Sequence, residues 1–185
     1  TVLAASPAIA QDDPVDLGTL VLSGGFTPVE ADAYGRAATI ITQEEIEDRG
    51  LRTVEEALRA VPGVAVSSTG GNFTQVRIRG AEANHTLILI DGIEAAGGDG
   101  EYILRGLETA NVERSEVLRG PQSVFYGSNA SAGVINIITR KGRIGTEYGG
   151  SITLGGATTV TGFVSTRDER GGISLSFSDV NDEGF

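Results

Sequence analysis

The C-terminal part of the sequence limits the fold most strongly, because three segments there alternate apolar residues with small or polar ones. These segments cover residues 151–154, 159–166 and 173–177. Gly155-Gly156 and the polar stretch 168–172 separate them and supply turn chemistry. A period of two puts apolar side chains on one face of a strand and polar ones on the other. The pattern fits hairpins of a β-barrel wall and also a soluble β-sandwich.

Residue 185 follows these segments directly, and two or three strands cannot close a barrel. We therefore expect the sequence as given to be truncated, and the alternation alone does not decide between the barrel and the sandwich.

Residues 36–142 have a different pattern, in which two helix starts lie close together. Thr42 and Thr53 each stand three residues before a glutamate, which is the spacing of a capping box. Gly50 and Pro62-Gly63 are placed to end the two helices. The spacing predicts a helix–turn–helix unit.

Short strands are predicted around these helices. The apolar run Leu87-Ile88-Leu89-Ile90, closed by Asp91-Gly92, predicts a central strand that is covered on both faces. Further strands are expected at 38–41, 64–66, 74–79, 111–119 and 134–139, with a helical turn at 121–126. The sequence thus predicts one α+β domain over 36–142, a mixed short-stranded sheet with two or three short helices.

The first 35 residues have no such pattern. Ala8-Ile9-Ala10 has the small-x-small form of a signal-peptidase site, so residues 1–10 read as the end of a signal peptide. Residues 11–35 contain acidic residues, proline and glycine but no Lys or Arg, which predicts a flexible leader. Within it, residues 19–22 form a short β-prone island.

Composition excludes several function classes. The 14 basic and 25 acidic residues give a net charge of −11, so no nucleic-acid partner is expected. There is no Cys, and His85 is the single histidine, which removes thiolate and multi-histidine sites. We interpret His85 as a hydrogen-bonded structural residue. No apolar run reaches about 18 residues, so no transmembrane helix is predicted. We therefore predict no catalytic residues, no metal site, no cofactor and no enzyme activity.

Several segments carry a family resemblance. The segments are TLVLS (19–23), ITQEEIEDRG (41–50), VEEALRAVPGVAV (54–66), VRIRG (76–80), HTLILIDGI (85–93) and VERSEVLRGPQSVFYGSNASAGVINIITRKG (112–142). With these segments the sequence resembles the N-terminal part of TonB-dependent outer-membrane receptors over residues 17–142, and 146–185 resembles their first barrel strands. The resemblance implies that residues 143–185 are the first antiparallel strands of a truncated transmembrane β-barrel. The spacing of VRIRGAEANHTLILIDG favours the cobalamin-receptor-like branch, and siderophore receptors share much of it.

The resemblance implies a function. In this family a globular plug blocks a barrel in the outer membrane of Gram-negative bacteria. A TonB box in a periplasmic leader pairs with the energy-transducing protein TonB. We therefore expect proton-motive-force-driven uptake of a scarce small-molecule nutrient, a cobalamin or a ferric siderophore, with TonB as partner. The resemblance places the TonB box at Thr19, Leu20, Val21, Leu22 and Ser23, an extended and unpaired segment that can add to a partner sheet.

Two glycine-rich loops are the candidate ligand contacts. Loops 67–73 and 94–102 join strands, bring backbone close to a ligand, and each contains an aromatic residue that could stack on it. The candidate ligand-binding residues are Asn72, Phe73, Glu94, Asp99, Glu101 and Tyr102. The acidic residues favour a neutral or cationic ligand.

Charges at 112–121 form the other candidate site. Arg77, Arg79, Arg114 and Arg119 alternate with Glu113 and Glu116, which predicts the wet face of the plug sheet. By resemblance, Arg119 and less firmly Arg114 would lock the plug to glutamates of the barrel wall. Ser115 stands where the family has a branched apolar residue, and we expect its side chain to point into the core.

Two other functions stay open at this point. The protein could be a signalling receptor of the same family, although such receptors carry an extra N-terminal domain. It could also be a soluble secreted plug-like binding module.

Overall fold

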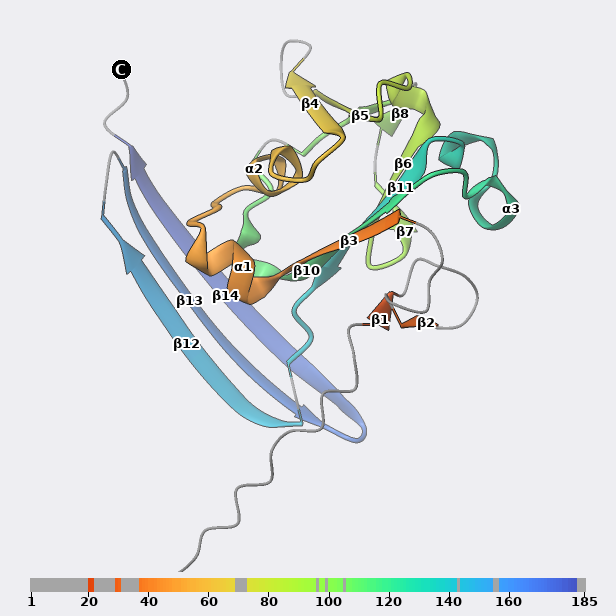
Figure 1. Cartoon of the computed structure of the whole chain (residues 1–185). Coiled ribbons are helices and arrows are strands. Elements are labelled where there is room, and N and C mark those ends of the chain that lie inside the picture. Colours follow the sequence, from red (N-terminus) through yellow and green to blue (C-terminus); the bar gives the residue numbers. More distant parts are fainter. Residues whose placement is uncertain are drawn as a thin grey trace, which may run out of the picture.

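The computed structural model describes residues 20–21, 29–30, 37–68, 73–95, 97–98, 100–104, 106–142, 144–154 and 157–182. The predicted signal peptide and most of the predicted leader lie outside these ranges. The described chain forms an α+β plug and a curved three-stranded wall against it (Figure 1). Within these ranges, no helix has the length and hydropathy needed to cross a membrane.

A mixed five-stranded sheet is the centre of the plug. Its strands, in spatial order, are β3 (Ala37–Thr42), β10 (Val112–Arg119), β11 (Gly133–Thr139), β6 (Thr86–Ile90) and β7 (Ile93–Glu94). All neighbours are antiparallel except β11 and β6, which are parallel. The predicted strand 111–119 is the one that pairs with both β3 and β11.

A second, four-stranded sheet was not predicted. Its order is β4 (Val64–Ser68), β5 (Thr74–Ile78), β9 (Glu101–Tyr102) and β8 (Gly97–Gly98). Arg77 lies on β5, and Arg79 has left the strand with φ of +52°. The predicted wet face therefore does not exist as one surface, because Arg77 and Arg114 belong to different sheets. Glu116 is also fully buried, so that part of the prediction was wrong.

The two capped helices form as expected. In α1 (Gln43–Asp48), Thr42 Oγ1 accepts from the Glu45 amide, and Gly50 follows the helix with φ of +61°. In α2 (Val54–Arg59), Thr53 and Glu56 complete the reciprocal capping box. A short helix α3 (Ser123–Tyr126) follows Pro121. The remaining turns are η2 (Ala83–His85), η3 (Thr109–Asn111) and η4 (Ser128–Ala130).

The main core lies between the five-stranded sheet, the two helices and the four-stranded sheet. Ile41, Val117 and Ile135 of the sheet are buried there with Leu58 of α2 and Val76 of β5. The opposite face of the sheet is covered at one end by α3 and η4, which bury a smaller apolar cluster, Leu87, Leu89, Ala130 and Val134. Strand β6 is thus buried on both faces, which confirms the prediction from its apolar run.

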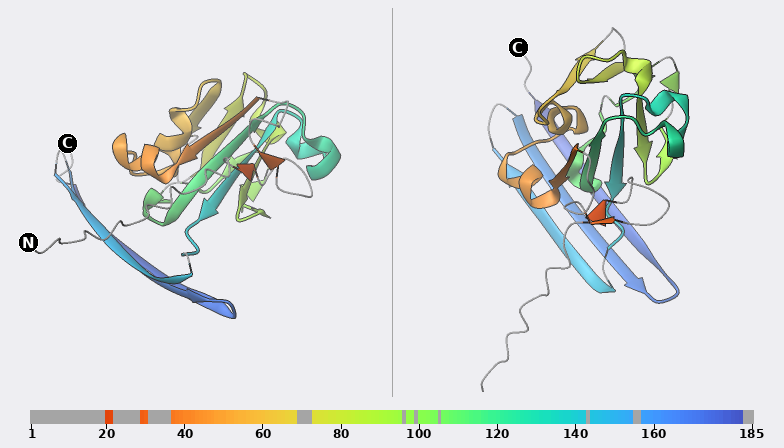
Figure 2. Two further views of the ribbon diagram at one scale, coloured as in Figure 1. Left: turned by 60° about the horizontal axis from the view of Figure 1, so that its bottom comes forward. Right: turned by 45° about the vertical axis from the view of Figure 1, so that its right-hand side comes forward.

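The wall consists of β12 (Gly145–Thr153), β13 (Ala157–Asp168) and β14 (Gly171–Asp182) in a continuous antiparallel sheet. Figure 2 shows it as a bent layer with the plug on its concave side. Tyr148, Ile152, Leu175 and Phe177 project from the other side, and each is at least 61% exposed. The predicted alternation is confirmed, and residue pairs such as Tyr148 with Val164 fix its register.

Candidate functional site

The outer face of the four-stranded sheet carries a hydrogen-bonded polar row. Thr74, Val76 and Ile78 of β5 point into the core, which leaves Gln75 and Arg77 half-buried on the other face. Gln75 lies opposite Ser67 of β4 and Glu101 of β9. Gln75 donates to Glu101 at 3.4 Å, and Arg77 donates to Gln75 at 2.7 Å and to Ser67 at 3.4 Å. We call Ser67, Gln75, Arg77 and Glu101 the polar row.

The structure brings together some of the predicted ligand-binding residues. Phe73 is 44% exposed directly before β5, and Glu101 is half-buried in the polar row of the same sheet. Glu94 is exposed, but it lies on β7 of the five-stranded sheet, where it pairs with Leu89 of β6. Asn72 and Asp99 lie outside the described residues.

Tyr102 does not have the exposure that its predicted role requires. Only 6% of the residue is exposed, and its hydroxyl donates to the Thr86 carbonyl at 2.9 Å. Burial raises the pKa of the Tyr102 hydroxyl above its ordinary value. The ring belongs to the main core, and its buried hydroxyl anchors β9 to β6. The exposed apolar side chain beside it is Ile103, at 56%.

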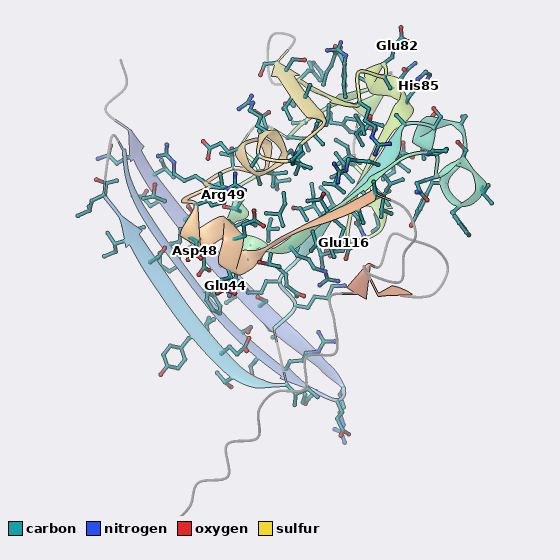
Figure 3. The ribbon with its side chains drawn as sticks, in the orientation of Figure 1. Glu44, Asp48, Arg49, Glu82, His85 and Glu116 are labelled. Carbon is teal, nitrogen blue, oxygen red and sulfur yellow. The ribbon has the colours of Figure 1, made fainter. Side chains whose placement is uncertain are left out.

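Turn η2 lies next to the β8–β9 hairpin and was not predicted from the sequence. A Cβ atom on Gly100 would lie 2.3 Å from the Asn84 nitrogen, so the hairpin packs directly on the backbone of η2. Figure 3 shows Glu82 and His85 close to each other at the outer edge of the plug. His85 is exposed, which differs from the structural role predicted for it. Helix and strand periodicity carries no signal for such a turn.

Both predicted lock residues bind within the plug. Arg119 donates to the Pro62 carbonyl at 2.9 Å and to Thr39 Oγ1 at 2.7 Å. Arg114 pairs with Glu113 at 2.6 Å and with the buried Glu116 at 2.9 Å. Their predicted partners on the wall are not among the described residues, so the lock stays a prediction.

Two contacts between plug and wall involve residues that the sequence did not point to. Where the chain leaves β11, the Arg140 guanidinium lies 3.9 Å from the centre of the Phe163 ring on β13. Arg167, also on β13, donates to the Lys141 carbonyl at 3.4 Å. Phe163 and Arg167 share the concave face of the wall, since residues an even number apart on a strand point the same way. We call the Arg140–Phe163 contact the plug–wall latch.

The leader island is partly described. Leu20–Val21 forms strand β1 and pairs antiparallel with β2, Val29–Glu30. The island is extended as predicted, but it is not unpaired, because the chain supplies its own short partner strand. This ladder has only two residue pairs.

The described residues hold no group of three or more His, Cys, Asp or Glu side chains that could bind a metal ion. Acidic side chains such as Glu45, Glu56 and Glu116 instead bind amides or arginines of the plug.

Comparison with known proteins agrees with this architecture. The iron-regulated outer membrane virulence protein of Vibrio cholerae serotype O1 is 40% identical over 156 residues, which cover 80% of this chain and 23% of that protein. The ferric-catecholate import receptor Fiu from E. coli K12 matches with 29% identity and a TM-score of 0.58, over 78% of this chain and 21% of that one. The alcaligin receptor FauA from Bordetella pertussis shares the fold, with a TM-score of 0.65 at 16% identity, over 86% and 29%.

This chain therefore spans less than a third of the length of these relatives. Two of them are named for iron, and none supports the predicted lean toward cobalamin receptors. The family profile described as the TonB-dependent Receptor Plug Domain matches residues 31–134, which is more than half of the chain. The chain belongs to the TonB-dependent receptor plug domain family.

Proposed function

We propose that this chain is the plug and first wall strands of an outer-membrane receptor that imports a ferric siderophore. The observation that carries the proposal is the position of the plug on the concave side of the wall, opposite the apolar side chains of the convex side. A wall with an apolar outer face and a polar inner face suits a lipid exterior and an aqueous interior. The plug then lies where it obstructs the passage.

Iron is the nutrient that the relatives support. The Vibrio cholerae relative is iron-regulated by name, and the E. coli receptor is named for ferric-catecholate import. The exposed Phe73 and Ile103 beside the polar row offer the mixture of apolar and hydrogen-bonding groups that small-molecule sites use. Phe73 and Glu101 are the predicted contacts that this surface retains, with Asn72, Glu94 and Asp99 as further candidates.

Import across the outer membrane needs energy, and in this proposal the leader couples the receptor to TonB, which provides it. A short extended segment can add to the sheet of TonB through main-chain hydrogen bonds. Strand β1 already has this geometry, and its two-pair ladder with β2 gives little resistance to exchange. In this proposal the leader lies in the periplasm, and TonB binds residues 19–23.

The experiment expresses the full-length receptor in cells whose own copy of the receptor gene is deleted. The cells grow in iron-limited medium. Leu20→Pro removes a main-chain donor from β1, so energised uptake of the radioiron-loaded siderophore should fall more than tenfold while binding to de-energised cells stays unchanged. Leu20→Ile, which keeps the size and the extended preference, is the matched control. Wild-type uptake by Leu20→Pro would refute the coupling, and a wild-type receptor that imports no ferric siderophore would refute the function.

A further inference from the structure

Three of the six asparagines in the chain are followed, two residues later, by serine or threonine. They are Asn72, Asn84 and Asn129, and in none of them is the residue between a proline. This spacing is the acceptor sequence for glycans that are joined to the asparagine side chain of exported proteins. A receptor of the outer membrane crosses the periplasm, which is where bacteria that make such glycans attach them.

One of the three also has an acidic residue two positions before the asparagine. Glu82 precedes Asn84 at this distance, whereas glycine precedes Asn72 and Asn129. Bacterial transferases that attach glycans to asparagine recognise such a carboxylate together with the hydroxyl on the other side. The segment Glu82-Ala83-Asn84-His85-Thr86 therefore carries every side chain that this chemistry requires.

The structure places this segment on an exposed turn. Glu82 is the N-cap of η2, and its side chain makes no capping hydrogen bond. Glu82, Asn84 and His85 are all exposed, and Glu82 and His85 lie at the outer edge of the plug (Figure 3). Within the described residues, the Asn84 side chain forms no hydrogen bond. The acceptor nitrogen is therefore accessible, and no other group of the described plug holds it.

Thr86 has a hydroxyl that the folded plug does not use. The residue is the first of β6 and is fully buried, and its Oγ1 has no hydrogen-bond partner in the described part of the protein. Its backbone carbonyl accepts from Tyr102, which any residue at this position could provide. A buried hydroxyl without a partner is destabilising, and valine has the same shape without it. A role before folding, while the chain is extended in the periplasm, explains why the hydroxyl is present.

We propose that Asn84 is the acceptor of an N-linked glycan, which an oligosaccharyltransferase attaches during export from a polyprenyl-pyrophosphate-linked oligosaccharide. The Asn84 side-chain nitrogen forms the new bond to the anomeric carbon of the first sugar, and the bond from that carbon to the pyrophosphate oxygen breaks. The nitrogen gives up one proton, which leaves with the polyprenyl pyrophosphate, so the step needs no oxidant or reductant. The inference requires export of the chain and is independent of the nutrient that the receptor imports.

Asn129 provides a control within the same chain. It lies in turn η4 and is exposed like Asn84, and the exposed Ser131 supplies the hydroxyl. Position 127 is glycine, so the carboxylate is missing. Exposure and hydroxyl are thus alike at the two asparagines, and the acidic side chain differs.

The test maps the glycopeptides of the full-length receptor purified from the outer membrane of its own host. Mass spectrometry should find a series of sugar additions on the peptide that contains Asn84, and Asn84→Gln should remove it. Glu82→Gln should lower the modified fraction at least tenfold, whereas Asn129→Gln should leave it unchanged. Unmodified Asn84 in the wild-type receptor would overturn the inference. An unchanged modified fraction in Glu82→Gln would overturn the role given to the carboxylate.

Thr86 separates modification from folding. Thr86→Val should remove the glycan, and Thr86→Ser should keep it. In cells that make no such glycan, the urea midpoint of the plug in Thr86→Val should equal or exceed that of the wild type. A lower midpoint would show that the folded plug uses the hydroxyl, which contradicts the argument from its burial. Radioiron uptake is measured in the same cells, because a glycosylated receptor that imports no ferric siderophore would refute the proposed function and support this inference.

Discussion

The plug and the wall are built from strands in the same chain, yet they are stabilised in different ways. The plug buries its large apolar side chains between two sheets and two helices, and Leu58, Ile88 and Ile135 are fully buried there. The wall leaves its large apolar side chains exposed on the convex side, and Tyr148 is 83% exposed. Its order comes from long ladders of nine to twelve residue pairs. The plug therefore depends on its core, whereas the wall depends on backbone pairing and its surroundings.

The first prediction compares an aspartate in a hairpin turn of each region. Asp91 has φ of +51°, and its carboxylate accepts from the Thr139 amide at 3.0 Å and from the Thr139 hydroxyl at 2.6 Å. Asp91→Ala removes both bonds and places alanine in the left-handed region, so the free energy of local unfolding of the five-stranded sheet should fall by about 2–4 kcal/mol. Hydrogen exchange of β6 and β11 amides in the full-length receptor measures this.

Asp168 is the counterpart in the wall. Its carboxylate accepts from the Arg170 amide at 2.8 Å and the Gly171 amide at 2.9 Å in the exposed β13–β14 turn. Asp168→Ala should cost only about 0.5–1.5 kcal/mol locally, because the exposed bonds are lost as in Asp91→Ala but Asp168 has no positive φ to strain an alanine. Equal losses in the two variants would contradict the distinction between a core-dependent plug and a ladder-dependent wall.

The turn at Asp91 also shows how much the sequence predicts. Asp91-Gly92 predicts a turn that closes the apolar strand, and the structure has that turn. The pairing of β7 with β6 across the turn was not predicted. The helix boundaries were predictable for the same reason, since caps such as Thr53 and stops such as Gly50 act within one turn of backbone. The wall alternation is equally local.

Features that depend on distant pairing were not predictable. Glu116 stands in a charged, alternating segment, and its burial follows only from its position between Ile40 of β3 and Asn136 of β11. Tyr102 has an aromatic side chain in a glycine-rich loop, and its place in the core depends on β9 lying beside β5. The latch joins Arg140 to Phe163, 23 residues later, and no motif marks either residue.

The second prediction tests that latch, where the two regions meet. A desolvated contact between a guanidinium and an aromatic ring contributes about 1–2 kcal/mol. Arg140→Gln and Phe163→Leu should each loosen the plug, and the double variant should add little to either, which a double-mutant cycle on plug unfolding in urea would measure. Phe177→Leu, which changes a ring on the convex face, is the control. Fully additive losses would show that Arg140 and Phe163 do not act together.

The third prediction concerns the core of the plug. Ser115 is fully buried between Ile41 and Ile137 of the neighbouring strands, as expected, and its hydroxyl has no partner in the described structure. Ser115→Ala removes this unpaired group, so the plug should gain up to about 1 kcal/mol of stability in denaturant unfolding. The exposed Ser123 of α3 provides the control, since Ser123→Ala removes no buried polar group. A loss of stability in Ser115→Ala would show that the hydroxyl is hydrogen-bonded in the full-length protein.

The last prediction uses pH to separate the plug core from the wall. Burial raises the pKa of Tyr102 above its ordinary value of 10.0, and the nearby Glu94 carboxylate acts in the same direction. Because the folded protein holds the proton more tightly than the unfolded chain, this contribution is fully present at neutral pH and is lost as the pH rises beyond about 10. Plug stability, followed by hydrogen exchange or urea unfolding, should therefore fall in alkaline buffer.

The variant Tyr102→Phe tests this assignment. At neutral pH it should be less stable than the wild type by about 0.5–1.5 kcal/mol, because it lacks the bond to the Thr86 carbonyl. Above pH 10 it should lose less stability than the wild type. A variant that follows the wild-type pH curve in parallel would show that Tyr102 stays protonated throughout or that another group controls the alkaline loss.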